Sequence, residues 1–223
     1  MISARALEKY FPPVRALGPV DFDIPAGSQV ALLGESGSGK STLLNLLGCM
    51  EVPSSGDLEM QGKLTRGLSE KELAEMRLRK IGYVHQFFDL ISDLNALENV
   101  MLPMWMAGDA ESETRATDLL KSLGLGHRLT QTASLLSGGE QQRVAIARAL
   151  SLSPSLILAD EPSGSLDSST GEAVVTLLLE LTKKAGSTLI MATHSPAAAA
   201  RFEHFIRLKD GKIVEKNLPK VKE

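Results

Sequence analysis

A glycine-rich run that joins a predicted strand to a predicted helix constrains the fold of this chain more than any other feature. Residues 34–42 read Gly-Glu-Ser-Gly-Ser-Gly-Lys-Ser-Thr and fit the pattern G-x-x-x-x-G-K-[S/T]. The run follows the apolar segment 29–33 and opens the apolar segment 41–49, for which we predict a helix. A strand that enters a helix through such a loop is typical of a phosphate-binding site on an α/β sheet. A Gly/Ser-rich turn without a ligand is the alternative, and the flanking strand and helix disfavour it.

Each residue type in this run has a physical role toward phosphate. Glycines let backbone N–H groups approach the phosphate oxygens, and the helix N-terminus adds about half a positive charge. Lys40 is expected to reach the β- and γ-phosphates, and the Ser41 hydroxyl is expected to bind Mg²⁺. The predicted nucleotide contacts in the run are Gly34, Ser36, Gly37, Ser38, Gly39, Lys40, Ser41 and Thr42.

Strand and helix patterns alternate along the rest of the chain, which predicts an α/β fold with a mainly parallel sheet. The other buried-strand candidates are residues 81–84, 156–159 and 188–192, and a polar motif follows each of them. In open parallel sheets, ligands bind beyond the carboxyl ends of the strands. We therefore expect four residues that follow the strands to meet at one edge of the sheet: Gly34, Gln86, Asp160 and His194.

The middle of the chain, from residue 65 to about residue 153, has a mostly helical pattern. Helices are predicted over residues 69–80, 95–106 and 112–123, the first with a Ser-x-x-Glu capping box. This predicts a helical subdomain inserted into a core of residues 1–64 and 154–223, all within one domain. Alternating segments at 20–24 and 57–60 predict a small antiparallel β layer, and Asp210-Gly211 predicts a hairpin turn.

Two acidic residues end the predicted strand at 156–159. Asp160 is suited to hold Mg²⁺ through water, and Glu161 is suited to orient or deprotonate the water that attacks a γ-phosphate. An isolated Asp-Glu pair could also simply end a strand. Beside a phosphate loop, the pair favours hydrolysis of ATP with Mg²⁺ as the cofactor.

Charge and hydropathy limit the partners of the chain. Its 223 residues carry a formal net charge of −3, without a long block of like charges. Because no broad positive field follows from this balance, we expect no nucleic-acid partner. The longest nearly apolar stretch, residues 100–108, is far short of the roughly 18 residues that span a bilayer. The first residues also lack the apolar run of a signal peptide, so a cytoplasmic protein is expected.

Several motifs together resemble those of one family, the ATP-binding-cassette (ABC) ATPases. Residues 136–143, Leu-Ser-Gly-Gly-Glu-Gln-Gln-Arg, are similar to the signature sequence of that family, and Ser165-Leu166-Asp167 is similar to its D-loop. Gln86 corresponds to the glutamine loop and His194 to the switch histidine. The order and spacing match over nearly the whole chain. The resemblance implies that His194 contacts the γ-phosphate, that Gln86 contributes to the magnesium shell, and that Asp167 lies across a dimer interface.

The residues Ser137, Gly138 and Gly139, here called the signature turn, precede an apolar-periodic helix at 141–150. They predict a second helix N-terminus with a hydroxyl, which suits a γ-phosphate. One nucleotide already fills the phosphate loop, so the turn needs a second one. The family resemblance implies a head-to-tail homodimer in which each signature turn covers the nucleotide of the other copy. An ordinary helix cap is the alternative.

The resemblance also implies that Tyr10 stacks on adenine. Stacking on a nucleobase tolerates sequence variation, and Phe11 is adjacent, so the assignment could shift by one residue. A role in core packing is a nearly equal alternative at this position.

A narrower resemblance concerns the subfamily that powers lipoprotein release and macrolide export. It rests on residues 93–100, 138–150 and 158–162. It implies a separate integral membrane permease as partner, docked near residues 86–89, and a location on the inner face of the cytoplasmic membrane through that permease. A soluble ABC ATPase of DNA repair or translation is less favoured, since no long heptad insertion separates Lys40 from Ser137. A phosphate-loop kinase or GTPase would leave the signature turn without a role.

Overall fold

The computed structural model describes residues 1–220 and contains a mainly parallel sheet with helices on both faces. The strand order in this sheet is β10-β9-β3-β8-β7-β6, and β10 runs antiparallel to β9 while the other neighbours are parallel. The strands are β3 (Gln29–Leu33), β6 (Ile81–Val84), β7 (Leu156–Asp160), β8 (Thr188–Thr193), β9 (His204–Lys209) and β10 (Lys212–Asn217). The predicted α/β class with a mainly parallel sheet is confirmed, and β3 has the predicted bounds.

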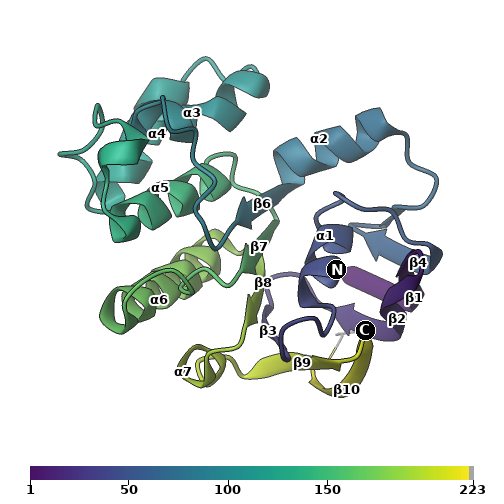
Figure 1. The fold of residues 1–223 in the computed structure, drawn as a ribbon. Helices are drawn as coiled ribbons and strands as arrows, with labels where there is room; N and C mark the ends of the chain where they lie inside the picture. Colours follow the sequence, from purple (N-terminus) through teal and green to yellow (C-terminus); the bar gives the residue numbers. More distant parts are fainter. Residues whose placement is uncertain (221–223) are drawn as a thin grey trace.

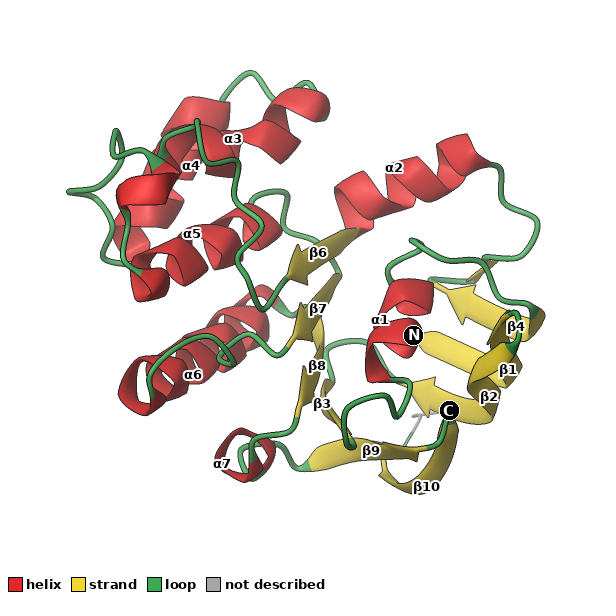
Figure 2. Ribbon diagram, in the orientation of Figure 1, coloured by secondary structure: helices red, strands yellow, loops and turns green. Residues whose placement is uncertain are grey.

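A second, antiparallel sheet has the order β2-β1-β4-β5 and lies beside α1 (Lys40–Leu47), as Figures 1 and 2 show. Its strands are β1 (Ile2–Phe11), β2 (Val14–Ile24), β4 (Ser55–Met60) and β5 (Lys63–Leu64). The predicted antiparallel layer is present, but β1 was not predicted, and β2 is longer than the predicted 20–24. Register shifts interrupt the β1–β2 pairing at three places between Ala4 and Tyr10. Such irregularities break the period-2 alternation by which a strand is found in a sequence.

Two hydrophobic clusters cover the two faces of the parallel sheet. On one face, Leu156 and Leu158 of β7 pack in the cluster that holds Leu44 of α1 and the antiparallel sheet. On the other face, Ile157 packs with Leu178 of α6 (Ser168–Ala185). Successive residues of one strand thus enter opposite cores, as expected for a sheet buried on both sides. The phosphate-loop helix α1 is therefore fixed between two sheets.

A third hydrophobic cluster joins α3 (Ala96–Met106), α4 (Ser112–Ser122) and α5 (Gly138–Leu150). The short 3-10 helix η1 (Ala133–Leu135) precedes α5. The remaining helix of this region, α2 (Glu70–Lys80), starts with the predicted Ser69–Glu72 capping box and leads into β6. The span of 65–153 that we assigned to a helical subdomain thus includes β6, which pairs with β7 in the core sheet. The division into a core of residues 1–64 and 154–223 and a helical subdomain of about 65–153 stays a prediction.

Short connections at the carboxyl ends of the parallel strands complete the fold. The helix α7 (Pro196–Ala199) follows β8, and the hairpin turn Asp210–Gly211 joins β9 to β10. Both turn residues have positive φ, 49° and 73°, as a two-residue hairpin of this kind requires. Among the described residues, no helix has the length and apolar character needed to cross a bilayer.

Candidate functional site

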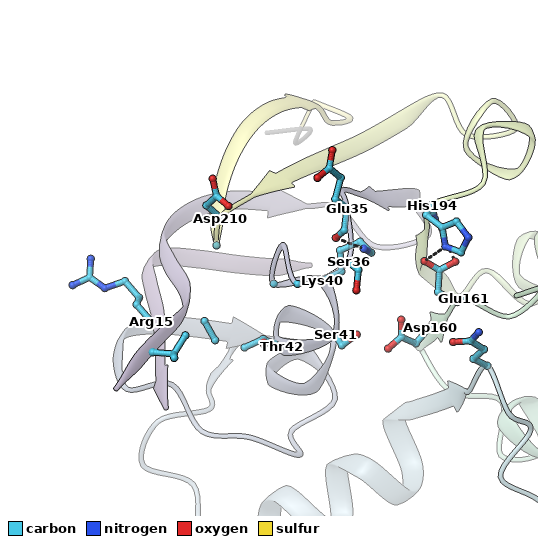
Figure 3. Close-up of a pocket in the computed structure, with 16 residues that line it drawn as sticks. Arg15, Glu35, Ser36, Lys40, Ser41, Thr42, Asp160, Glu161, His194 and Asp210 are labelled. Carbon is cyan, nitrogen blue, oxygen red and sulfur yellow. Dashed lines mark hydrogen bonds and ion pairs between the residues drawn. The ribbon is translucent and has the colours of Figure 1, made fainter. Parts of the chain in front are cut away.

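A pocket of about 920 Å³ opens at the carboxyl ends of β3, β7 and β8 (Figure 3). The residues that line it come from the phosphate loop, from the start of β2, from the ends of three strands and from the β9–β10 turn. They are Val14, Arg15, Ala16, Glu35, Ser36, Gly37, Gly39, Lys40, Ser41, Thr42, Gln86, Asp160, Glu161, His194, Asp210 and Gly211. Of the four residues predicted to meet at this edge, Gln86, Asp160 and His194 line the pocket. Gly34 is not among the lining residues, but its carbonyl accepts a hydrogen bond from Lys40, which does line the pocket.

The loop before α1 presents unpaired backbone donors to this pocket. Gly39 is the N-cap of α1 with φ 102°, and neither a side-chain cap nor an acidic residue occupies the first turn. The first N–H groups of the helix therefore remain free for an anion. Lys40 is only 7% exposed, and its Nζ donates to the carbonyls of Gly34 at 2.8 Å and Glu35 at 2.9 Å. The ammonium is thus held above the loop, where phosphates would lie.

The shape of the loop depends on close backbone approaches. A Cβ on Gly34 would lie 2.5 Å from Oγ of Ser38, and one on Gly39 would lie 2.7 Å from the carbonyl oxygen of Ala16. The turn at Gly211 supports the loop from outside, because its N–H donates to the carbonyl of Ser38 at 3.1 Å. Only glycine fits at these approaches. The Oγ of Ser38 is buried without a hydrogen-bond partner.

An acid–base pair closes the other end of the pocket. Nδ1 of His194 lies 2.9 Å from Oε1 of Glu161, and the His194 backbone N–H donates to Oε2 of Glu161 at 3.3 Å. The Glu161 side chain is 14% exposed and that of His194 is 69% exposed. Glu161 has φ 48°, and its N–H donates to the carbonyl of Ala192 in the neighbouring strand. The carboxylate is therefore fixed at the pocket wall beside Asp160.

The residues suited to Mg²⁺ line the same pocket: Ser41, Gln86 and Asp160. Within residues 1–220, no group of three or more His, Cys, Asp or Glu side chains could hold a metal by itself. A hydroxyl, an amide oxygen and one carboxylate fit Mg²⁺, because this ion is usually bound through one or two carboxylates together with waters and substrate phosphates. The donor set therefore fits a metal that arrives with a nucleotide.

The signature turn lies outside this pocket in the same chain. Ser137 is the N-cap of α5, its hydroxyl donates to Oε2 of Glu140 at 2.8 Å, and Glu140 also accepts from Arg128. The hydrogen bonds from Ser137 and then from Arg128 lower the pKa of Glu140 to about 2. Gly138 and Gly139 follow in the first turn of the helix. A single copy therefore does not bring Ser137, Gly138 and Gly139 to its own phosphate loop.

Asp167 also lies away from the phosphate loop. It caps α6 by accepting from the Thr170 N–H at 3.0 Å and the Ser169 hydroxyl at 2.7 Å, and these bonds lower its pKa. It lines a second cavity of about 570 Å³, which shares Glu161 and His194 with the first. Glu161 and His194 thus line both cavities.

The residues that line the pocket far from His194 are not those predicted from the sequence. Arg15 and Asp210 lie on the opposite side of Lys40 from Glu161 and His194 (Figure 3). Tyr10 is not part of the pocket lining, although it is 46% exposed and pairs with Arg15 in the sheet. Six further lining residues were not predicted from the sequence: Val14, Arg15, Ala16, Glu35, Asp210 and Gly211. For Asp210-Gly211 a turn signal existed, but nothing local indicated that this turn touches the loop.

Comparison with known proteins agrees with this geometry. A family model described as "ABC transporter" matches residues 17–164, which is more than half of the chain. The chain belongs to this family. It is 45% identical to the lipoprotein-releasing system ATP-binding protein LolD of Shewanella denitrificans over 199 residues, covering 88% of this chain and 85% of LolD. It is 43% identical to the macrolide export ATP-binding/permease protein MacB of Mannheimia succiniciproducens, covering 96% of this chain and 34% of MacB.

Solved structures of ABC cassettes have the same fold. The dimeric structure of the ATP-binding cassette MJ0796 in a post-hydrolysis state, bound to ADP and Pi, matches with a TM-score of 0.88 and 38% identity over the full length of both chains. The chain is thus an ATP-binding subunit of the ABC transporter type and an ATPase. The ABC resemblance seen in the sequence is confirmed.

Proposed function

We propose that this ABC ATPase is the motor subunit of a transporter of the lipoprotein-release or macrolide-export type. Binding of ATP closes a head-to-tail homodimer, hydrolysis reopens it, and the movement drives a separate membrane permease. One observation carries this proposal: the pocket holds the phosphate loop and the Glu161–His194 pair, whereas the signature turn of the same chain lies outside it. The pocket therefore lacks a cover that a second copy can supply.

Different residues bind the phosphates, activate the attacking water and stack on the adenine. Lys40 and the free N–H groups of α1 bind the β- and γ-phosphates, where a fixed positive potential is worth more than in water. Glu161 takes the proton of the attacking water, and its ion pair with the His194 imidazole and its hydrogen bond from the His194 backbone N–H hold the carboxylate at the pocket wall. Tyr10, exposed near the carboxyl end of β1, stacks on the adenine.

Magnesium is the expected cofactor. Ser41, Gln86 and Asp160 would hold it. Mg²⁺ would neutralise the negative charge that develops on the phosphate oxygens. Ser41 and Asp160 belong to rigid elements, since Ser41 is in α1 and Asp160 ends β7. Gln86 follows β6 and belongs to the connection toward α3, so it is the donor that can move with the helices.

A homodimer fits both the chemistry and the comparisons. Head-to-tail pairing would place Ser137, Gly138 and Gly139 over the γ-phosphate bound to the other copy, and it would place Asp167 at the shared interface. The hydroxyl of Ser137 and the N-terminus of α5 then act on the anion, as they do on Glu140 in the single chain. The matching MJ0796 cassette is described as dimeric.

A membrane permease is the second expected partner. The LolD relative is named as a subunit of a lipoprotein-releasing system, and MacB is named as an ATP-binding/permease protein in which this chain spans about a third of the length. We infer that the chain works on the inner face of the cytoplasmic membrane, bound to a permease. Nothing observed in the chain favours DNA repair or translation over transport.

The dimer is tested by size exclusion of the Glu161→Gln variant. This variant should elute as a dimer with ATP and Mg²⁺ and as a monomer without nucleotide, because hydrolysis, which reopens the dimer, is blocked while ATP binding remains. The Glu161→Gln/Lys40→Ala double variant should stay monomeric under both conditions, since the loop loses its ammonium. A Glu161→Gln protein that stays monomeric at saturating ATP, alone and with its membranes, would contradict the proposed motor.

The permease is tested by purification from native membranes. A tagged chain should bring down an integral membrane protein in a complex that hydrolyses ATP. Recovery of the ATPase in the soluble fraction alone would contradict the transport role.

A further inference from the structure

The segment that carries Gln86 has a backbone conformation that its residues do not favour. Phe88 and Asp89 follow Gln86 closely and have φ values of 66° and 49°. In this left-handed region the Cβ of an ordinary residue crowds the backbone carbonyl. Such conformations persist where surrounding contacts determine the backbone. The segment after β6 is therefore held by contacts from outside it.

Arg148, near the end of α5, makes the most direct of these contacts. Its Nη1 donates to the carbonyl of Asp89 at 2.6 Å, and its Nη2 donates to the carbonyl of Phe88 at 3.1 Å. The guanidinium presents its N–H groups as a rigid planar fork, so it fixes the directions of both carbonyls as well as their distances. The fork thus holds the two residues with unfavourable φ values.

Other contacts fix the start of the same segment. The side chain of Gln142 is fully buried, and its Nε2 donates to the carbonyl of His85 at 3.4 Å. The hydroxyl of Ser165, in the loop before α6, donates to the carbonyl of Gln86 at 2.7 Å. Gln142 and Arg148 both belong to α5, so one helix holds the segment on both sides of Gln86.

We propose that Arg148 is a positioning residue that keeps Gln86 directed into the nucleotide pocket. Through Arg148 and Gln142, the helix that begins at the signature turn fixes the segment that carries a proposed magnesium donor. Since a helix is rigid over this length, a displacement of Ser137 by a bound phosphate would be transmitted to Gln86 (Figure 1 shows α5 beside the end of β6). This proposal rests on the proposed function for the magnesium role of Gln86.

The hold of Arg148 on the segment is tested without nucleotide by hydrogen–deuterium exchange. Arg148→Lys keeps the charge and the stem but loses the two-pronged contact. Exchange in residues 86–91 should rise about 10-fold, because a hydrogen bond from a charged donor is worth at least that factor. Exchange in α2 should not change. The matched control is Arg66→Lys, whose parent side chain is exposed and lies 3.8 Å from Asp57; its exchange should match that of the wild-type chain.

The consequence for Gln86 is tested by the magnesium dependence of ATP hydrolysis. Arg148→Lys should require about 10-fold more Mg²⁺ for half-maximal rate, while its affinity for ATP in EDTA stays as in the wild-type chain. Adding Asp89→Gly should restore part of the magnesium dependence, because glycine adopts positive φ without steric cost.

Several outcomes would overturn the proposal. Wild-type exchange at 86–91 in Arg148→Lys would do so. The proposal would also be overturned if exchange in Arg148→Lys rose evenly along the chain and if adding Asp89→Gly did not reduce it. That result would indicate a general loss of stability. The Gln86→Ala variant distinguishes the magnesium role of Gln86 from the positioning role of Arg148. Wild-type magnesium dependence in Gln86→Ala would contradict the magnesium role. The exchange measurement on Arg148→Lys would still test the positioning role independently.

Discussion

The carboxylate of Glu161 is held by His194 through both of its oxygens, at 2.9 Å from the imidazole Nδ1 and at 3.3 Å from the backbone N–H. The two residues follow neighbouring strands, β7 and β8, whose parallel register pairs Asp160 with Ala192. Sheet geometry, rather than a flexible side chain, sets their distance. We propose Glu161 as the general base, and a base positioned in this way accepts a proton without a further rearrangement.

Replacing Glu161 by Gln should reduce steady-state phosphate release by about 100-fold to 10,000-fold, the range that a general base contributes. The amide has nearly the shape of the carboxylate, so ATP binding should remain. The measurement is phosphate release at saturating ATP and Mg²⁺. Glu180→Gln, on the exposed surface of α6, is the matched control and should keep the wild-type rate. Equal rates for the Glu161→Gln variant and the wild-type chain would refute the assigned role.

Ser69 and Ser137 have the same local structure, so comparing their alanine variants distinguishes the loss of a helix cap from the loss of contact with a partner's nucleotide. Ser69 and Ser137 each form a capping box, with Glu72 and Glu140 respectively. Changing either serine to Ala should cost about 1 kcal/mol and lower the midpoint of thermal unfolding by about 2–4 °C. Only Ser137→Ala, in the Glu161→Gln background, should also abolish the ATP-dependent dimer. If Ser69→Ala abolished it equally, loss of stability would explain both results.

The ionised form of Glu140 should stabilise the chain in a defined pH range. Hydrogen bonds from Ser137 and Arg128 lower its pKa from the ordinary 4.5 to about 2 in the folded state. Because the folded pKa is depressed, this stabilisation is complete above about pH 4.5 and is lost as the pH falls toward 2. The wild-type chain should therefore exceed Glu140→Gln in thermal midpoint at pH 6, and the difference should shrink at pH 3. A difference independent of pH would contradict this origin of the stability.

The turn at Gly211 should contribute to nucleotide binding through the phosphate loop. Gly211 and Gly62 have similar φ values, 73° and 79°, but a Cβ would lie 3.0 Å from the Ala16 carbonyl oxygen at Gly211 and near no atom at Gly62. Both Gly→Ala changes should cost about 1 kcal/mol through backbone strain. Only Gly211→Ala should also weaken ATP binding, because its N–H supports the carbonyl of Ser38. Calorimetric titration with ATP checks this, and equal affinities in the two variants would contradict it.

The sequence was most informative where the physical signal is local. The apolar runs of β3, β6, β7 and β8 predicted these strands to within one residue at each end, since buried parallel strands are short and continuously apolar. The turn at Asp210-Gly211 followed equally well from its residue types, because positive φ is needed at both positions.

Contacts between distant parts of the chain could not be predicted in this way. The support that Gly211 gives to Ser38 joins residues far apart in sequence, and no periodicity reports it. The same holds for the fork of Arg148 on Phe88 and Asp89. The bulges of β1 removed the alternation that would have revealed this strand. The capping box of Asn95 and Glu98 had a signal that we did not use, an Asn three residues before a Glu.

A mixed-chain labelling experiment tests whether the signature turn of one copy touches the nucleotide bound by the other. A tagged Lys40→Ala chain, which should not bind ATP itself, is mixed with the Glu161→Gln chain and an ATP analogue that carries a photoreactive group on its γ-phosphate. Light should label residues 136–143 of the tagged chain, and only when the second chain is present. Labelling confined to the Glu161→Gln chain, which holds the intact phosphate loop, would contradict it.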